Sequence, residues 1–184
     1  MTLDLGTGDG HFVLARATAR PDELVVGMDA SQAAMAEASR RAARSTRRGG
    51  LPNARFVVAA AESLPSELAG VGDLVTVHFP WGSLLRGAMG ADPQVAERLA
   101  ILVAAGGRLR LLLSGAPGDA RSGVSEVDPA RVVATFVRLG LVAGEVRPAT
   151  LADAHAARSS WGRRLLSGAN GARRAWLVEL ARER

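Results

Sequence analysis

The chain has 184 residues, a length typical of one domain, and its 48% hydrophobic and 22% charged residues exclude a disordered protein. It has no cysteine and three scattered histidines, which excludes disulfide scaffolds and thiol catalysis and argues against a metal site. No apolar run reaches the roughly 18 residues of a membrane span, and the N-terminus lacks a signal-peptide pattern. We therefore expect a soluble, cytoplasmic protein with one domain over residues 1–184.

The charge is unevenly distributed along the chain. All 23 basic residues are arginine, and the formal net charge is +5. Residues 39–55 contain six arginines and no acid, and residues 150–184 contain seven arginines against three acids. Two basic surfaces on a mildly acidic body favour a polyanionic partner. A solvated helix face followed by a basic loop explains the pattern equally well, so charge alone leaves both interpretations open.

Short apolar segments alternate with segments of helical periodicity along most of the chain. The predicted strands cover residues 2–5, 24–28, 54–58, 73–79, 107–113, 141–147 and 174–180. The predicted helices cover residues 10–20, a segment from the N-cap Ser31 that frays near 47–50, residues 92–104, and residues 128–139 before Gly140. A long loop with one short helix joins the last two strands.

Strands that alternate with helices of 10–15 residues predict βαβ units and a parallel sheet covered on both faces. The closing pair of strands has a different connection and could be antiparallel. The predicted fold class is α/β, with a Rossmann-like, mostly parallel seven-stranded sheet and helices on both faces.

A glycine-rich loop, Asp4-Leu5-Gly6-Thr7-Gly8-Asp9-Gly10, follows the first strand. Open α/β sheets bind small molecules at this edge. A dinucleotide fingerprint needs its third glycine at position 11, which is His11. Acids in the loop would repel a pyrophosphate and suit the ammonium and sulfonium of S-adenosylmethionine (SAM). The spacing is similar to that of the D/E-x-G-x-G-x-G loop of class I SAM-dependent methyltransferases.

Two further acids follow the next two strands in order. Asp29 ends the second strand, where a carboxylate can accept hydrogen bonds from both ribose hydroxyls. Ala61 and Glu62 follow the third strand, where class I methyltransferases commonly hold the adenine ring. Asp29 could instead cap the following helix, and Glu62 could lie in a solvated first turn. The loop and both acids in this order favour a SAM site.

The fourth strand is followed by Pro80 and Trp81, without the Asn or Asp that would orient an exocyclic amine. A ring nitrogen such as adenine N1 offers its own in-plane lone pair, so the methyl transfer depends mostly on positioning. Trp161 is flanked by polar residues and could stack on the other face of a base, each face contributing roughly 1–3 kcal/mol. Alternatively, Trp81 and Trp161 are core or lid residues, as we expect for Trp176.

Four motifs together resemble the aminoglycoside-resistance 16S rRNA methyltransferases of the Kam family, which modify N1 of adenosine 1408. The motifs are D-L-G-T-G-D-G, A-A-A-E-S-L-P, F-P-W-G-S-L-L-R-G and S-S-W-G-R-R-L. The resemblance implies that Trp81 and Trp161 stack on the target base without a general base. It implies SAM contacts from Asp4, Gly6, Thr7, Gly8, Asp29, Ala61, Glu62, His78, Ser83 and Ser159. It implies RNA contacts from Arg47, Arg48, Arg163, Arg164, Arg173 and Arg174.

The resemblance also implies the substrate and the partners. We expect methyl transfer from SAM to adenosine 1408 of 16S rRNA, near helix 44 of the 30S subunit, by a monomer without a membrane or metal. The chain begins almost at the glycine loop, so the N-terminal β-hairpin typical of the family is expected to be absent. A SAM-dependent small-molecule methyltransferase, or a SAM- or RNA-binding homologue with little turnover, remains the alternative.

Overall fold

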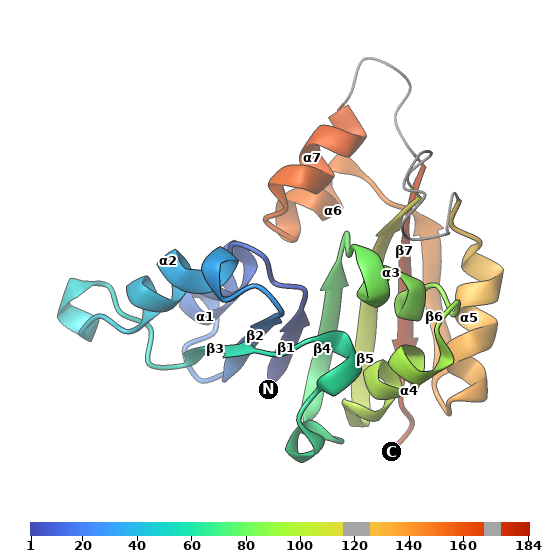
Figure 1. Cartoon of the computed structure of the whole chain (residues 1–184), viewed down its shortest axis with the longest axis horizontal. Helices are drawn as coiled ribbons and strands as arrows, with labels where there is room; N and C mark the ends of the chain where they lie inside the picture. Colours follow the sequence, from blue (N-terminus) through green and yellow to red (C-terminus); the bar gives the residue numbers. More distant parts are fainter. Residues whose placement is uncertain (116–125, 168–173) are drawn as a thin grey trace.

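The structure, a computed structural model, describes residues 1–115, 126–167 and 174–184 (Figure 1). Within these ranges the chain forms a seven-stranded sheet with the order β3-β2-β1-β4-β5-β7-β6. The strands are β1 (Thr2–Leu5), β2 (Val25–Asp29), β3 (Ala54–Val58), β4 (Gly72–His78), β5 (Val103–Ser114), β6 (Val142–Pro148) and β7 (Ala175–Ala181). Strand β7 pairs antiparallel with β5 and β6, and the other described pairs are parallel. The predicted fold class is confirmed, including the antiparallel closing pair.

Helices connect most of these strands. They are α1 (His11–Ala19), α2 (Gln32–Ala42), α3 (Gly82–Ala88), α4 (Pro93–Ile101), α5 (Pro129–Arg138), α6 (Leu151–Ala156) and α7 (Ser160–Ser167). Three 3₁₀ turns are η1 (Thr46–Arg48), η2 (Ala61–Ser63) and η3 (Ser66–Leu68). As predicted, Ser31 caps α2, because its hydroxyl accepts a hydrogen bond from the Ala34 amide at 3.3 Å. None of the described helices is long and apolar enough to cross a lipid bilayer.

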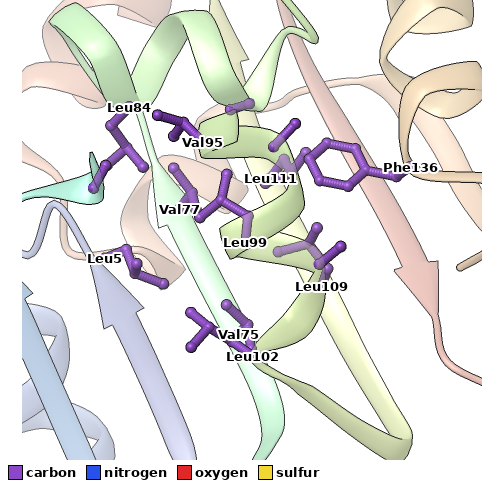
Figure 2. Close-up of a cluster of buried hydrophobic side chains, with 14 of the residues drawn as sticks. Leu5, Val75, Val77, Leu84, Val95, Leu99, Leu102, Leu109, Leu111 and Phe136 are labelled. Carbon is purple, nitrogen blue, oxygen red and sulfur yellow. The ribbon is translucent and has the colours of Figure 1, made fainter. Parts of the chain in front are cut away.

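Apolar side chains cover both faces of the sheet. On one face α3, α4 and α5 pack on the central strands, with Leu99, Leu111 and Phe136 fully buried between them (Figure 2). On the other face α1 and α2 pack through Val13 and Ala38, and a third cluster joins α6 and α7 to β5 and β7. Side chains alternate between faces along each strand, so the central strands β1, β4 and β5 bury residues on both faces, whereas the edge strand β6 is mostly exposed.

Several predicted boundaries are wrong. Helix α4 ends at Ile101 rather than 104, and β5 begins at Val103 rather than 107, because Gly106 at φ +77° lets the strand bend without ending it. Helix α3 was not predicted, since its glycines conceal a helical pattern. The connection between β6 and β7 holds two helices instead of one, so Trp161 lies on a helix and not in a loop.

Candidate active site

A cavity of about 450 Å³ opens at the carboxyl ends of β1, β2 and β4. Its wall comes from the glycine loop, from η2, from the segment after β4 and from the start of α7. The cavity brings together every residue that was predicted to bind the cofactor or stack on the base: Asp4, Gly6, Thr7, Gly8, Asp29, Ala61, Glu62, His78, Trp81, Ser83, Ser159 and Trp161.

The glycine loop turns sharply over the end of β2. Gly6, Gly8 and Gly10 all have positive φ angles, between +56° and +71°, which residues other than glycine rarely adopt. The Gly6 amide donates to the Met28 carbonyl at 2.8 Å and fixes the loop on the strand. A Cβ on Gly8 would meet no atom within 4 Å, so at this point the loop presents bare backbone to open space beside the cavity.

Asp29 joins the loop to the start of α2. One carboxylate oxygen accepts a hydrogen bond from the Gly8 amide at 2.9 Å, and the other accepts one from the Ser31 amide at 2.8 Å. Asp29 therefore orders the turn before α2, whose N-cap is Ser31, while it also lines the cavity. Each carboxylate oxygen has a second lone pair, so the same side chain can accept further bonds from a ligand.

Asp4 is the most deeply buried acid of the wall, with 2% of its surface exposed. Its Oδ1 accepts a hydrogen bond from Thr76 Oγ1 at 2.7 Å and lies 3.3 Å from Nδ1 of His78. Among the described residues no hydrogen bond reaches Oδ2. His78 packs its ring edge-on against Phe12, with centroids 4.6 Å apart. A buried carboxylate with one oxygen held by the protein is suited to a cationic ligand.

Thr7 carries a buried hydroxyl without a partner. In the described part of the chain, Oγ1 of Thr7 is the one buried side-chain polar atom that lacks a hydrogen-bond partner. An unsatisfied buried hydroxyl costs about 1–3 kcal/mol. Thr7 belongs to the cavity wall, but this oxygen has almost no exposed surface and lies against Gly27 of β2.

Glu62 and Ser83 bring η2 and α3 together at the cavity. The Ser83 hydroxyl beside Glu62 lowers the pKa of that carboxyl, with a backbone hydrogen bond as the next cause. Glu62 therefore lies ionised in the first turn of η2 and adds negative charge to the wall.

The segment after β4 is held in an unusual conformation. Phe79 has φ +49°, a left-handed backbone that is rare for a bulky residue, and its ring is buried. The Phe79 amide donates to the Leu112 carbonyl at 2.8 Å. The ring packs on Gly162 of α7, where an added Cβ would lie 2.2 Å from Cε2. This contact holds α7 against the segment after β4, at the cavity. Helix α7 lies beyond the ends of the central strands (Figure 1).

The two tryptophans meet at this junction. Their ring centroids lie 5.0 Å apart at an angle of 51°, and 53% of the Trp81 surface is exposed. The hydroxyl of Ser159 accepts a hydrogen bond from the Gly162 amide at 2.9 Å and so caps the helix that carries Trp161. A base between the two rings needs roughly 7 Å, twice an aromatic contact distance. The rings must therefore separate before a base can lie between them.

The predicted RNA-binding arginines that the structure describes lie outside the cavity wall. Arg47 and Arg48 are exposed on η1, Arg174 is exposed just before β7, and Arg173 lies outside the described residues. On α7, Arg163 is half-buried and Arg164 is exposed, with its guanidinium carbon 5.8 Å from the Trp161 ring centroid. That distance is typical of a cation–π contact, so Arg164 also supports the Trp161 ring.

The wall also contains residues that were not predicted as site residues, among them Phe12 and Arg158. Phe12 could have been found from its position in the first turn after the glycine loop. Arg158 carries no motif signal, because its place at the cavity depends on the turn between α6 and α7.

Several known proteins with similar sequences share one name. The chain is 46% identical to the 16S rRNA (adenine(1408)-N(1))-methyltransferase of Streptoalloteichus hindustanus over 100 residues. This match covers 54% of the chain and 46% of the relative. Over 114 residues, 62% of this chain and 52% of the relative, it is 41% identical to the same-named enzyme of Streptoalloteichus tenebrarius. The matched region thus spans about half the length of these curated relatives.

Solved structures match more of the fold. The enzyme of that name from Catenulisporales acidiphilia is similar over 100% of this chain and 87% of its own, with a TM-score of 0.80 and 32% identity. The 16S rRNA methyltransferase KamB gives a TM-score of 0.87 at 27% identity over the same shares. At the level of the family, the match covers residues 1–180. The chain therefore belongs to the NpmA family, 16S rRNA (adenine(1408)-N(1))-methyltransferase.

Proposed function

We propose that this chain transfers a methyl group from SAM to N1 of adenosine 1408 in the 16S rRNA of the 30S subunit, and thereby confers aminoglycoside resistance. The observation that carries the proposal is the meeting of Trp81 and Trp161 at the mouth of an acid-lined cavity beside a glycine loop. The names of the family and of its similar relatives support the same reaction.

The residues of the cavity fit SAM. The carboxylates of Asp4 and Asp29 line the cavity and suit an ammonium and ribose hydroxyls. Ala61 and Glu62 would border the adenine ring, and the hydroxyls of Ser83 and Ser159 would face the remainder of the cofactor. When bound, SAM supplies the electrophilic methyl group. A variant of the Catenulisporales acidiphilia enzyme was solved with SAM as its cosubstrate.

Stacking positions the target base. Trp81 and Trp161 open by about 2 Å from their 5.0 Å contact and hold the base by its two faces. Adenine N1 attacks through its own lone pair, so the protein removes no proton and contributes orientation and exclusion of water. The methylated base is a cation, which two indole rings stabilise.

Arginines outside the cavity wall dock the folded RNA. Arg47 and Arg48 lie on η1, Arg163 and Arg164 lie on α7, and Arg174 directly precedes β7. Such side chains read the shape and the phosphates of structured RNA rather than its sequence. We propose that the chain acts as a monomer, in the cytoplasm, on assembled 30S subunits near helix 44.

The test incubates the purified protein with 30S subunits and labelled SAM and maps the modified base by primer extension. We expect one modified position, adenosine 1408. Trp81→Ala and Trp161→Ala should abolish methylation and leave SAM affinity nearly unchanged, whereas Trp176→Phe, on β7 and outside the cavity wall, serves as the matched control. Full activity in both alanine variants would refute the stacking role. Absence of binding to 30S subunits at low salt would favour a small-molecule substrate instead.

A further inference from the structure

The charged residues of the cavity wall leave one part of SAM without an obvious partner. Among the described residues, the wall contains four acids and a single arginine, Arg158. The acids suit the ammonium, the sulfonium and the ribose, but they repel the carboxylate at the end of the methionine tail. This carboxylate needs a donor or a cation within the cavity.

Arg158 lies in a backbone position that favours glycine. Arg158 follows α6 and has φ +53°. Its amide donates to the His155 carbonyl at 3.0 Å, and the Ser159 amide donates to the Ala154 carbonyl at 3.1 Å. This pair of bonds is a Schellman motif, with Arg158 at the left-handed position where glycine is most common. An arginine here carries a conformational cost that glycine avoids, which indicates that its side chain is needed.

The guanidinium of Arg158 is available for a ligand. Among the described residues no hydrogen bond or ion pair engages it, whereas Arg147 and Arg182 donate to acceptors of the protein. Arg163, Arg164 and Arg174 can meet RNA phosphates from outside the cavity wall. The tail carboxylate, in contrast, can be reached only by residues that line the cavity.

We propose that Arg158 binds the carboxylate of the methionine tail of SAM and so fixes the cofactor's orientation in the cavity. A guanidinium fits a carboxylate with two parallel hydrogen bonds. This role rests on the proposed function, because it assumes that SAM occupies the cavity. It makes Arg158 a residue that discriminates ligands with an amino-acid tail from those without one.

The test uses a variant that relieves the backbone instead of straining it. Arg158→Gly removes the side chain and supplies the residue that this conformation favours, so we expect an equal or higher melting temperature. By calorimetry its affinity for S-adenosylhomocysteine, which carries the same tail, should fall about tenfold, the loss of a partly exposed charge-assisted bond. Its affinity for 5′-methylthioadenosine, which has no tail, should stay unchanged. Arg158→Asn should reproduce both results.

Arg138→Gln, in the last turn of α5, is the matched control and should bind both ligands like the unmodified chain. If the unmodified chain binds neither SAM nor S-adenosylhomocysteine, the proposed function itself fails. If it binds them and Arg158→Gly binds S-adenosylhomocysteine equally well, only the role of Arg158 is refuted. An equal loss of affinity for S-adenosylhomocysteine and 5′-methylthioadenosine would also refute the role of Arg158. A loss of affinity for 30S subunits alone would refute it too, and would assign Arg158 to an RNA phosphate.

Discussion

Phe79 and Gly162 are in direct contact across the cavity junction, and the absence of a side chain on Gly162 makes the contact possible. An added Cβ would lie 2.2 Å from Cε2 and 2.7 Å from Cδ2 of the Phe79 ring. The contact joins the two tryptophan motifs, because Trp81 lies two residues after Phe79 and Trp161 directly precedes Gly162. The spacing of the two indoles therefore depends on how closely α7 approaches the segment after β4.

Gly162→Ala should displace α7 from Phe79. We expect a loss of about 1–3 kcal/mol in the free energy of unfolding, the usual cost of overpacking. The tryptophan emission should also change, because the contact between Trp81 and Trp161 is lost. Urea unfolding followed by fluorescence measures both effects. Ser167→Ala, at the exposed end of the same helix, is the control, and equal stability of Gly162→Ala and this control would contradict the packing described here.

Two glycines of the cofactor loop should respond differently to the same substitution. A Cβ on Gly10 would lie 2.6 Å from the Phe56 ring and 2.7 Å from the Ala38 side chain. Gly10→Ala should therefore lower the free energy of unfolding by more than about 1 kcal/mol, which lowers the melting temperature of a domain of this size by about 2–4 °C or more. A Cβ on Gly8 meets open space at the cavity, so Gly8→Ala should weaken SAM binding more than it lowers the melting temperature. Calorimetry and thermal unfolding of both variants separate the effects, and identical behaviour would argue against this geometry.

The stabilisation that Asp153 provides at α6 should decrease at acid pH. Arg147 donates two hydrogen bonds to its carboxylate, at 2.7 and 2.8 Å, and holds the pKa of Asp153 well below its usual value. A depressed pKa in the folded state means that the stabilisation is complete above the unfolded pKa of about 3.9 and is lost as the pH falls below it. Asp153→Asn should cost about 1 kcal/mol at pH 7, as for a lost helix cap.

The difference in unfolding free energy between Asp153→Asn and the unmodified chain, measured in urea, should therefore narrow from about pH 4 downward. Because the other acids titrate equally in both proteins, their contributions cancel. A difference that stays constant between pH 7 and pH 3 would show that the charge of Asp153 does not hold α6.

The arginines of η1 should contribute to binding through charge alone. Removing Arg47 and Arg48 together should reduce the slope of log affinity for 30S subunits against log salt by roughly 2, one for each phosphate contact. SAM affinity should not change, because neither side chain lines the cavity. The salt dependence of 30S binding measures this effect. Arg20→Gln, exposed just after α1, is the control, and an unchanged slope in the double variant would exclude η1 from the RNA interface.

Local patterns predicted much of this fold. Most of the strands are apolar and clearly bounded, and Ser31 and Asp128 stand at predicted helix starts that the structure retains. The glycine loop and Asp29 could be located because their positions follow directly from strand ends. Their grouping around one cavity follows from the parallel connections, which bring the carboxyl ends of β1, β2 and β4 to one edge.

What local patterns missed depends on contacts between distant segments. Helix α3 contains glycines that weaken its helical signal, and the packing of Leu84 and Leu85 on the sheet stabilises it. The left-handed conformation of Phe79 is held by the bond to Leu112 and by α7, neither of which its neighbours in sequence encode. The place of Arg158 at the cavity likewise requires the turn after α6. Its proposed role, like those of the other site residues, stays a prediction.

The segment from Ala149 to Arg174 connects β6 to β7, and its two ends lie at neighbouring positions of the sheet. Pro148 and Trp176 are paired between β6 and β7, and the Ala149 amide donates to the Ala175 carbonyl at 2.8 Å. The strands therefore fix the two ends of this segment and not its length. A change of length between those ends can leave the strand register intact, because the bonds that set the register lie at and beyond the ends of the segment.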